Sequence, residues 1–284
     1  MSSVEEQIQK WIEKGDETVP LYLYDLDMEE LPELPANVQK LNCFNCNSLK
    51  ELSKLPPNLQ KIYCYNCSEL KELSELPKSL QILVCYNCPI KELSELPVNL
   101  LNLHCYNCPI KSLLDLPKSL QNLDCYNCPI EKLPELPVDL QELKCNKCPI
   151  KELPKLPKSL LKLYCSRCSI KELPELPPNL QYLECCECYI KELPTIPITL
   201  QKLECTHCRI LEKLPKLPNS LEILNCSSCP IETLPELPES LQKLFCSYCP
   251  IEKLPELPSS LIELNCYYCI IKSLPTILPV NIYL

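Results

Sequence analysis

The apolar residues of this chain recur in one pattern that repeats along almost its whole length. The frame is L-[SP]-x-L-P-x-x-L-x-x-L-x-C-x-x-C-x-I-x-x, and it occurs twelve times over residues 31–273, nine times with a length of 20 residues and three times with 21. Such short-period self-similarity is the signature of a solenoid, in which stacked coils bury a face that no single coil can bury alone. The copies begin at Leu31, Leu52, Leu73, Leu93, Leu113, Leu133, Leu153, Leu173, Leu193, Leu214, Leu234 and Leu254.

Within each copy, the alternation of apolar and polar positions predicts one short strand. In the copy that spans residues 93–112, Leu103 and Cys105 flank His104. Side chains alternate between the two faces of a strand, so we expect the leucine and the first cysteine to point inward and the histidine outward. Cys108 stands where the chain turns off the strand, and we expect it to be buried as well.

The other half of each copy, L-P-x-L-P, predicts an extended segment. Proline lacks a backbone N–H and fixes φ, so this half cannot form a regular helix. We expect polyproline-II-like geometry on the convex side of the coils.

Two segments before the first full copy have patterns of their own. Residues 2–15 predict an amphipathic helix that caps the first coil, with a capping box at Ser2 or Ser3 and a stop at Gly15. Residues 21–30 align with the strand of the repeat and predict a degenerate first strand. The apolar face of the helix consists of Val4, Ile8, Trp11 and Ile12, and the two cysteine positions of the degenerate strand hold Leu23 and Leu26.

These patterns predict one domain of an α/β-type solenoid that is mostly β. Residues 1–20 form its N-terminal cap, and residues 21–284 form the solenoid. The solenoid divides into the degenerate strand 21–30, the twelve repeats 31–273 and a partial coil 274–284.

The segment L-x-x-L-x-C-x-x-C-x-I has the form of a leucine-rich repeat. Together with L-P-x-L-P, it resembles the short-repeat leucine-rich proteins that some bacteria inject into host cells, the YopM and IpaH kind, over residues 21–284. The resemblance implies a right-handed superhelix with a parallel sheet on its concave face, and a role in binding a host protein. The chain departs from that family in its Cys-x-x-Cys pairs and in having no C-terminal ligase domain. Its cysteine-bearing repeats are also similar to those of large DNA viruses of amoebae.

Composition excludes several classes of function. The single glycine rules out a glycine-rich phosphate loop. The net charge of −9 is opposite in sign to the clustered positive charge of a nucleic-acid-binding surface. No apolar run approaches the roughly 20 residues that span a bilayer, and the N-terminus does not have the form of an export signal. We therefore expect a cytoplasmic protein, in a host cell if the effector resemblance extends to delivery, with thiols kept reduced.

The 25 cysteines allow two interpretations. Neighbouring pairs such as Cys105/Cys108 and Cys125/Cys128 have the spacing of four-cysteine zinc sites, so a zinc or iron–sulfur array, or a redox sensor, is the alternative. Buried free cysteine also packs as a small apolar residue, and the spacing follows from the repeat period itself. Because Leu23 fills an equivalent position, we favour core thiols, with no metal or cofactor.

Cys186 is the cysteine outside the pairs. It is adjacent to Glu187 and one repeat away from His207, a combination that can activate a thiol nucleophile. The sequence offers no glycine-built oxyanion hole, however, so we predict no catalytic residue and no enzyme activity. We expect His104 to be a surface residue.

The outward positions carry the candidate binding residues. Tyrosine is enriched at binding hot spots, so an exposed row of aromatic residues with a polar companion row predicts a protein-binding surface on the concave face. Repeat duplication without selection is the competing interpretation. The predicted partner-binding residues are Phe44, Tyr65, Tyr86, Tyr106 and Tyr126 with Asn66, Asn87, Asn107 and Asn127.

Farther along the chain, Glu184, Glu187 and Glu204 predict an acidic patch that suits a basic partner. We predict a non-enzymatic scaffold that binds a protein partner, with a host protein as one candidate, and that binds neither nucleic acid nor membrane. The apolar end of the repeat array makes a homodimer a further alternative.

Overall fold

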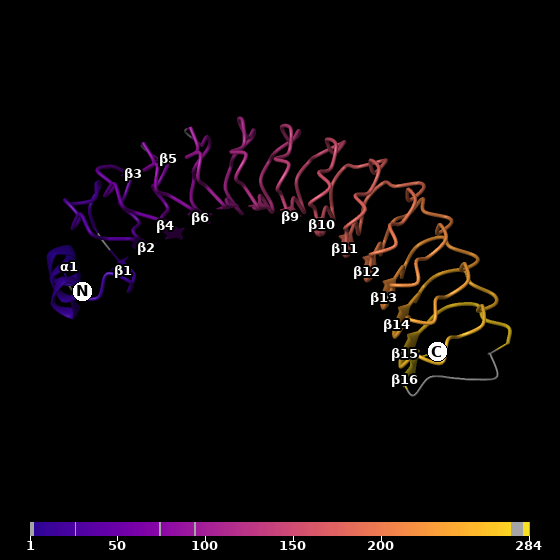
Figure 1. Cartoon of the computed structure of the whole chain (residues 1–284). Helices are drawn as coiled ribbons and strands as arrows, with labels where there is room; N and C mark the ends of the chain where they lie inside the picture. The colour runs from indigo at the N-terminus through magenta and orange to yellow at the C-terminus, as the bar shows by residue number, and fades with distance from the viewer. Residues whose placement is uncertain (1–2, 26, 74, 94, 274–280, 284) are drawn as a thin grey trace. The chain divides into compact units, whose positions relative to one another are not determined.

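The structure is a computed structural model that describes residues 3–25, 27–73, 75–93, 95–273 and 281–283. The described chain is a mostly-β parallel solenoid with one helix at its N-terminal end, which confirms the predicted fold class (Figure 1). It divides into two compact units, Met1–Leu140 and Gln141–Leu284. Leu26 and residues 274–280, for which we predicted a cysteine position and part of a last coil, lie outside the described residues.

In the first unit, the strands pair in parallel in the order β1-β2-β4-β6-β7-β8. Equivalent repeat positions lie opposite one another, because Cys64 pairs with Cys43 on one side and with Cys85 on the other. Leu23 pairs with Cys43, which confirms that a leucine can fill the first cysteine position. The strands are β1 (Leu21–Tyr24), β2 (Lys40–Phe44), β4 (Lys61–Tyr65), β6 (Ile82–Tyr86), β7 (Asn102–His104) and β8 (Asn122–Asp124).

The second unit repeats the same arrangement from β9 to β16, again with parallel pairing. Each coil is joined to the next by backbone hydrogen bonds, as between the amide of Cys145 and the carbonyl oxygen of Tyr164, 2.9 Å apart. The strands are β9 (Glu142–Lys144), β10 (Lys162–Tyr164), β11 (Tyr182–Glu184), β12 (Lys202–Glu204), β13 (Ile223–Asn225), β14 (Lys243–Phe245), β15 (Glu263–Asn265) and β16 (Asn281–Tyr283).

The core is a set of columns of leucine, isoleucine and cysteine. Leu163, Cys165 and Ile170 are each 0% exposed, while Tyr164 between the first two faces outward and is half-buried. Fully burying one leucine side chain contributes about 1.5–3 kcal/mol. The stacked columns therefore provide the main stabilisation of each coil, as alternation along the strand predicted.

A left-handed residue turns the chain off the strand between the two cysteines of every pair. These residues have φ between 51° and 60°, a region that asparagine enters more readily than most other residues. The strain is offset by a hydrogen bond to the next coil, as from the amide of Asn45 to the carbonyl oxygen of Tyr65 at 3.0 Å. The residues are Asn45, Asn66, Asn87, Asn107, Asn127, Lys147, Arg167, Glu187, His207, Ser228, Tyr248 and Tyr268.

The L-P-x-L-P half of each coil makes more backbone hydrogen bonds than a polyproline-II-like segment would. Its second proline begins a tight turn, in which the amide of Leu100 donates to the carbonyl oxygen of Pro97 at 3.0 Å. Two short strands on this side, β3 (Glu51–Leu52) and β5 (Glu72–Leu73), pair in parallel with each other. The two short strands are extended, as predicted, and the departure from a uniformly extended half is the turn that follows the second proline.

Helix α1 (Val4–Lys14) covers the first coil and has the predicted ends. Ser3 accepts a hydrogen bond from the amide of Glu6 at 3.3 Å, and Gly15 adopts the left-handed conformation with φ of 65°. The predicted apolar face was partly wrong, because Ile12 is 49% exposed whereas Gln7 is 5% exposed. Among the described residues, no helix has the length and apolar character of a membrane-spanning segment.

Gln7 is buried because its side-chain amide bonds to the backbone of strand β1. Its Nε2 donates to the carbonyl oxygen of Tyr24 at 3.2 Å, and its Oε1 accepts from the amide of Tyr24 at 3.0 Å. The side chain thus replaces the neighbouring strand that an edge strand lacks. Trp11 adds a third contact, since its Nε1 donates to the carbonyl oxygen of Val19 at 2.9 Å.

Replacement of Gln7 by alanine should destabilise the N-terminal end of the solenoid. The substitution leaves two backbone groups of Tyr24 without their partner, at a cost of about 1–3 kcal/mol each if they stay buried. We expect faster amide hydrogen exchange in β1 and a lower urea midpoint. Gln9→Ala is the matched control, because Gln9 is exposed and its side chain bonds that of Glu13 on the same helix. Equal exchange in the two variants would contradict the role of Gln7.

Candidate protein-binding surface

The outward side of the strands in the first unit carries a continuous series of rings. We call Phe44, Tyr65, Tyr86, Tyr106 and Tyr126 the aromatic row; each follows the first cysteine of its coil, and all five are half-buried. Strand register places them side by side, since Tyr65 pairs with both Phe44 and Tyr86. The structure therefore brings the predicted aromatic residues together in a column.

The rings of the aromatic row contact one another in alternating geometry. The centroids of Phe44 and Tyr65 lie 4.9 Å apart with an interplanar angle of 16°, and those of Tyr86 and Tyr106 lie 4.6 Å apart at 28°. Between these stacked pairs, Tyr65 and Tyr86 meet edge to face at 6.3 Å. Each such ring contact contributes about 0.5–1.5 kcal/mol of stabilisation beyond the burial of apolar area, so the contacts hold neighbouring rings in place relative to one another.

Two further tyrosines extend this surface beyond the predicted set. Tyr22 stacks on Phe44 at 6.5 Å, and Tyr63 stacks beside Tyr65 at 6.4 Å. Burial raises the pKa of Tyr63, and also that of Tyr65. Strand alternation predicts that the residue before the first cysteine position points outward. This position does not hold tyrosine from repeat to repeat, however, so the repeat pattern did not single out these two residues.

The asparagines beside the aromatic row have a structural role as well as an exposed amide. They occupy the left-handed turn, and Nδ2 of Asn87 donates to Oδ1 of Asn66 at 3.0 Å, as Nδ2 of Asn127 does to Oδ1 of Asn107 at 2.8 Å. We call Asn45, Asn66, Asn87, Asn107 and Asn127 the asparagine row. A primary amide has two N–H donors and two acceptor lone pairs, so these bonds leave further capacity for a partner.

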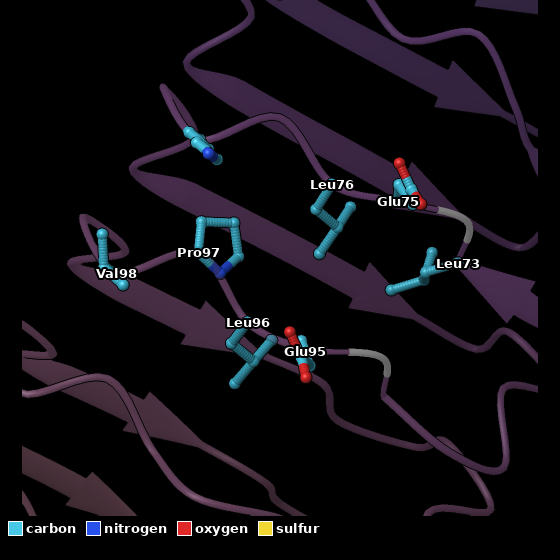
Figure 2. A pocket seen from close by; sticks show the side chains of 8 residues that line it. Leu73, Glu75, Leu76, Glu95, Leu96, Pro97 and Val98 are labelled. Carbon is cyan, nitrogen blue, oxygen red and sulfur yellow. The ribbon is translucent and has the colours of Figure 1, made fainter.

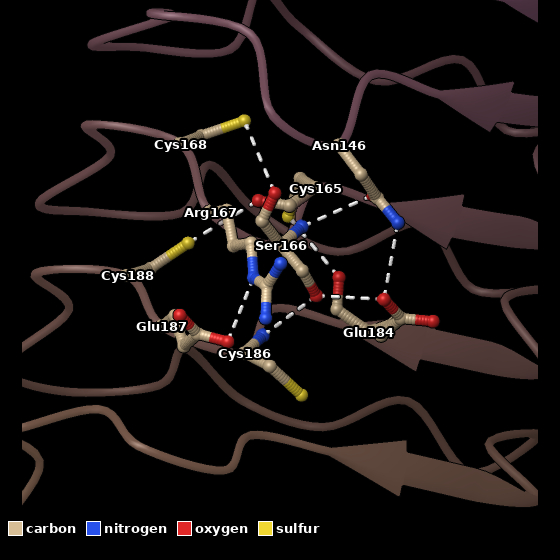
Figure 3. A network of polar contacts seen from close by, with 9 residues as sticks. All are labelled: Asn146, Cys165, Ser166, Arg167, Cys168, Glu184, Cys186, Glu187 and Cys188. Atoms are coloured by element: carbon tan, nitrogen blue, oxygen red, sulfur yellow. Dashed lines mark hydrogen bonds and ion pairs between the residues drawn. The ribbon is translucent and has the colours of Figure 1, made fainter. Parts of the chain in front are cut away.

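In the second unit, the same outward columns form a polar network around Glu184 (Figure 3). Its Oε1 accepts hydrogen bonds from Asn146 Nδ2 at 3.1 Å and from Ser166 Oγ at 2.7 Å. Tyr182 donates to its Oε2 at 3.2 Å. Ser166 also accepts from the amide of Cys186 at 2.9 Å, so the carboxylate is held by uncharged donors from several coils.

The predicted acidic patch was wrong, because the other two glutamates are paired with cations. Glu187 lies 2.7 Å from Nε of Arg167, and Glu204 lies 2.5 Å from Nζ of Lys202. Stacking places opposite charges in adjacent coils or on one strand, where they neutralise each other. The sequence shows each glutamate but does not show which basic side chain reaches it.

Cys186 is half-buried in this network and lies beside Ser166 and Thr206. Burial raises the pKa of its thiol, so the thiolate is disfavoured at neutral pH. The predicted neighbour His207 instead borders a separate hollow of about 250 Å³, with Glu187 and Arg209. His104 lies 3.8 Å from the carboxylate of Asp124 and is partly exposed, in agreement with its predicted surface location.

The paired cysteines form a ladder of thiol–carbonyl hydrogen bonds. The second cysteine of a coil donates to the carbonyl oxygen of the first cysteine one coil earlier, as from Cys128 to Cys105 at 2.8 Å and from Cys188 to Cys165 at 3.2 Å. Cys108 makes the same bond to Cys85 at 3.6 Å. Equivalent bonds run from Cys67 to Cys43, Cys88 to Cys64, Cys168 to Cys145, Cys208 to Cys185, Cys229 to Cys205, Cys249 to Cys226 and Cys269 to Cys246.

All 25 cysteines lie within the described residues and are free thiols. Within the same residues, no three His, Cys, Asp or Glu side chains form a group that could hold a metal ion. The thiol–carbonyl bonds give the second cysteines a structural role, whereas the absence of bound metal from the purified protein stays a prediction.

A hollow of about 710 Å³ lies on the L-P-x-L-P side of two neighbouring coils in the first unit (Figure 2). Leu76 and Leu96 line it at equivalent positions and are half-buried, whereas Leu156 in another repeat is 5% exposed. Its lining combines aliphatic side chains with the charged side chains of Glu75, Lys78 and Glu95. We place the candidate binding surface on the outward side of the strands, where the aromatic row lies.

Comparison with solved structures identifies the fold. The chain is similar to YopM from Yersinia enterocolitica WA-314, with a TM-score of 0.68 and 28% sequence identity over 98% of this chain and 79% of that chain. The chain is a leucine-rich-repeat solenoid. It is also similar to YopM from Yersinia pestis, a leucine-rich effector protein, with a TM-score of 0.54 and 27% identity over 92% of each chain.

A third similar leucine-rich-repeat structure is that of FLRT2 in an octameric complex with Latrophilin 3 and Unc5D. Its TM-score is 0.67 at 19% identity, over 85% of this chain and 88% of that chain. No protein-family model and no curated protein sequence matches this chain. The likeness to FLRT2 establishes the leucine-rich-repeat fold alone.

Brief alkylation of the native protein should modify two cysteines first. Cys186 and Cys269 are half-buried, whereas the other cysteines are buried. We expect iodoacetamide to label these two, as read by peptide mass spectrometry, and the remainder only after unfolding. Because the pKa of Cys186 is raised, its labelling rate should still increase above pH 9, past the usual thiol value of about 8.5. Rapid labelling of Cys128 or Cys168 in the folded protein would contradict their burial.

Proposed function

We propose that the chain is a non-enzymatic scaffold that binds a protein partner through the outward side of its strands, with the aromatic row as the main contact. The observation that carries this proposal is the row itself. Five consecutive coils present half-buried aromatic rings, the first four of which contact one another in series, beside a row of amides that is largely exposed. Rigid aromatic groups with adjacent hydrogen-bonding groups are typical of binding hot spots.

The fold does not require aromatic residues at these positions. In the second unit, the equivalent position holds Ser166, Thr206 and Ser247, and the strands there have the same parallel pairing. Core leucines and cysteines recur in both units, so the coils form with either set of outward residues. Recognition of a partner explains this local concentration of rings better than a requirement of folding does.

The similar structures support a binding role. YopM from Yersinia pestis, to which the chain is similar at 27% identity, is a leucine-rich effector protein. By this likeness we propose a protein partner for the present chain, with a host protein as the first candidate if the chain acts as an effector. In this proposal the protein works in a reducing compartment such as the cytoplasm, because its 25 cysteines are free thiols.

Loss of two central rings should abolish partner binding while the fold is retained. We expect Tyr86→Ser combined with Tyr106→Ser to lose partner proteins in affinity capture that is quantified by mass spectrometry. The thermal melt should fall by only a few degrees, because both rings are on the outward side and half-buried and the variant loses two ring contacts of about 0.5–1.5 kcal/mol each.

The matched control is Tyr164→Ser combined with Tyr182→Ser, which removes a contacting pair of tyrosines from the second unit. The control should retain the captured proteins that the first variant loses. If both variants capture the same set as the unaltered protein, the aromatic row is not the binding surface.

Elemental analysis should find less than one equivalent of zinc or iron in protein purified without oxygen and without chelators. In our proposal the paired thiols act as core groups that donate to backbone carbonyls, as Cys168 does to Cys145 at 3.1 Å. Two or more equivalents of either metal, lost together with stability on chelation, would instead favour a metal-binding array.

A further inference from the structure

We infer that the aromatic row binds a proline-rich segment in the polyproline-II conformation, flanked by lysine or arginine. This inference rests on the proposed function and names the chemistry of the partner segment. Four properties of the first unit support it: the spacing of its coils, the alternating geometry of its rings, the hydrogen-bonding capacity of the asparagine row, and the charges around the aromatic row.

Spacing favours polyproline II over the other regular conformations. Adjacent strands lie about 4.8 Å apart, so every second coil recurs at about 9.6 Å. A polyproline-II helix repeats every three residues, or about 9.3 Å. Side chains on one face of an extended strand repeat at about 6.7 Å, which matches neither the roughly 4.8 Å spacing of single coils nor the roughly 9.6 Å spacing of every second coil. The 5.4 Å pitch of an α-helix differs from the coil spacing by about 0.6 Å per turn, and this difference accumulates along the row.

The alternating ring geometry suits the same ligand. Phe44 and Tyr65 form one stacked pair, and Tyr86 and Tyr106 form the next, with an edge-to-face contact between the pairs. Successive proline rings on one edge of a polyproline-II helix can therefore pack against successive pairs. Aromatic surfaces are the usual receptors for such segments, because a preformed helix loses little conformational entropy on binding.

The asparagine row supplies donors for a backbone that has no internal hydrogen bonds. Carbonyl groups in polyproline II are fully solvated and need partners when a segment is docked. Asn66, Asn87 and Asn127 are exposed beside the rings, and each amide uses only one N–H in the bonds between asparagines. An α-helical ligand, whose carbonyls are already bonded internally, would leave these donors unused.

Charge indicates basic flanks. The aromatic row and the asparagine row consist of uncharged residues. At the β1 end, the exposed Asp25 occupies the left-handed position that the asparagines occupy in later coils. At the other end, Asp124 lies beside Tyr126. Lys40 and Lys61 occupy the outward column farthest from the rings, and His104 lies 3.8 Å from the carboxylate of Asp124. The net charge of −9 also attracts a basic segment at long range.

Fluorescence anisotropy with a labelled synthetic peptide tests the inference. The probe has two lysines, about six prolines and two further lysines, since six prolines span roughly the 19 Å covered by five coils. We expect saturable binding with Kd below about 1 mM. A glycine–serine peptide with the same lysines should bind at least about tenfold more weakly, because it keeps the charge but lacks the preformed helix.

Protein variants locate the bound peptide. Tyr86→Ser with Tyr106→Ser should weaken binding by more than about tenfold, whereas Tyr164→Ser with Tyr182→Ser should leave it unchanged. Asp25→Lys should weaken binding of the lysine-flanked peptide by about threefold and strengthen binding of a glutamate-flanked one.

Equal binding of the glycine–serine peptide, no dependence on the two tyrosines, or no binding at all would overturn the inference. The proposed function is judged separately by affinity capture. If capture depends on the aromatic row while the proline peptide fails to bind, a protein-binding scaffold stands and its ligand is not polyproline II.

Discussion

The described coils of this protein depend on backbone hydrogen bonds to their neighbouring coils. Those bonds hold equivalent residues of successive repeats opposite one another, as Cys64 lies between Cys43 and Cys85. Because the register is kept, each repeat position becomes a continuous column in space. Inward columns of leucine and cysteine remove apolar surface from water, and outward columns are free to differ between the two units. The division between stability and recognition follows from this single constraint.

Cysteine serves the second position of each pair for a reason beyond its size. The chain leaves the strand at the left-handed residue, and the next cysteine then points its thiol at the preceding coil. That thiol donates to the carbonyl oxygen of the first cysteine there, as Cys128 does to Cys105 at 2.8 Å. A thiol is a weak donor on a small apolar side chain, which suits a buried position that faces a carbonyl oxygen. Aliphatic side chains would fill the space but would not supply this hydrogen bond.

Much of the fold was predictable, because the same positions of each repeat point inward and the same positions point outward. Parallel stacking, the position of Leu23 and the ends of the N-terminal helix followed from alternation, register and capping residues. The burial of Gln7 was not predicted. Helical periodicity identifies buried apolar side chains, but it does not show that a side-chain amide will bond the open edge of a strand. Pairing of Glu187 with Arg167 was also missed, since the side chains of separate coils meet only in the stacked structure. The aromatic row was visible in sequence, but Tyr22 and Tyr63 became part of its surface only once ring contacts were known.

A crystal structure phased on the anomalous signal of sulfur would test the central claim most directly, since it locates every thiol and any bound metal in one measurement. We predict that the second cysteines lie inside the coils, with Sγ–oxygen distances to the preceding first cysteines like the 2.8 Å at Cys128 and the 3.2 Å at Cys208. The aromatic row should face solvent in the same crystal. Anomalous peaks stronger than sulfur between neighbouring cysteine pairs, or thiols that point into solvent, would contradict the account.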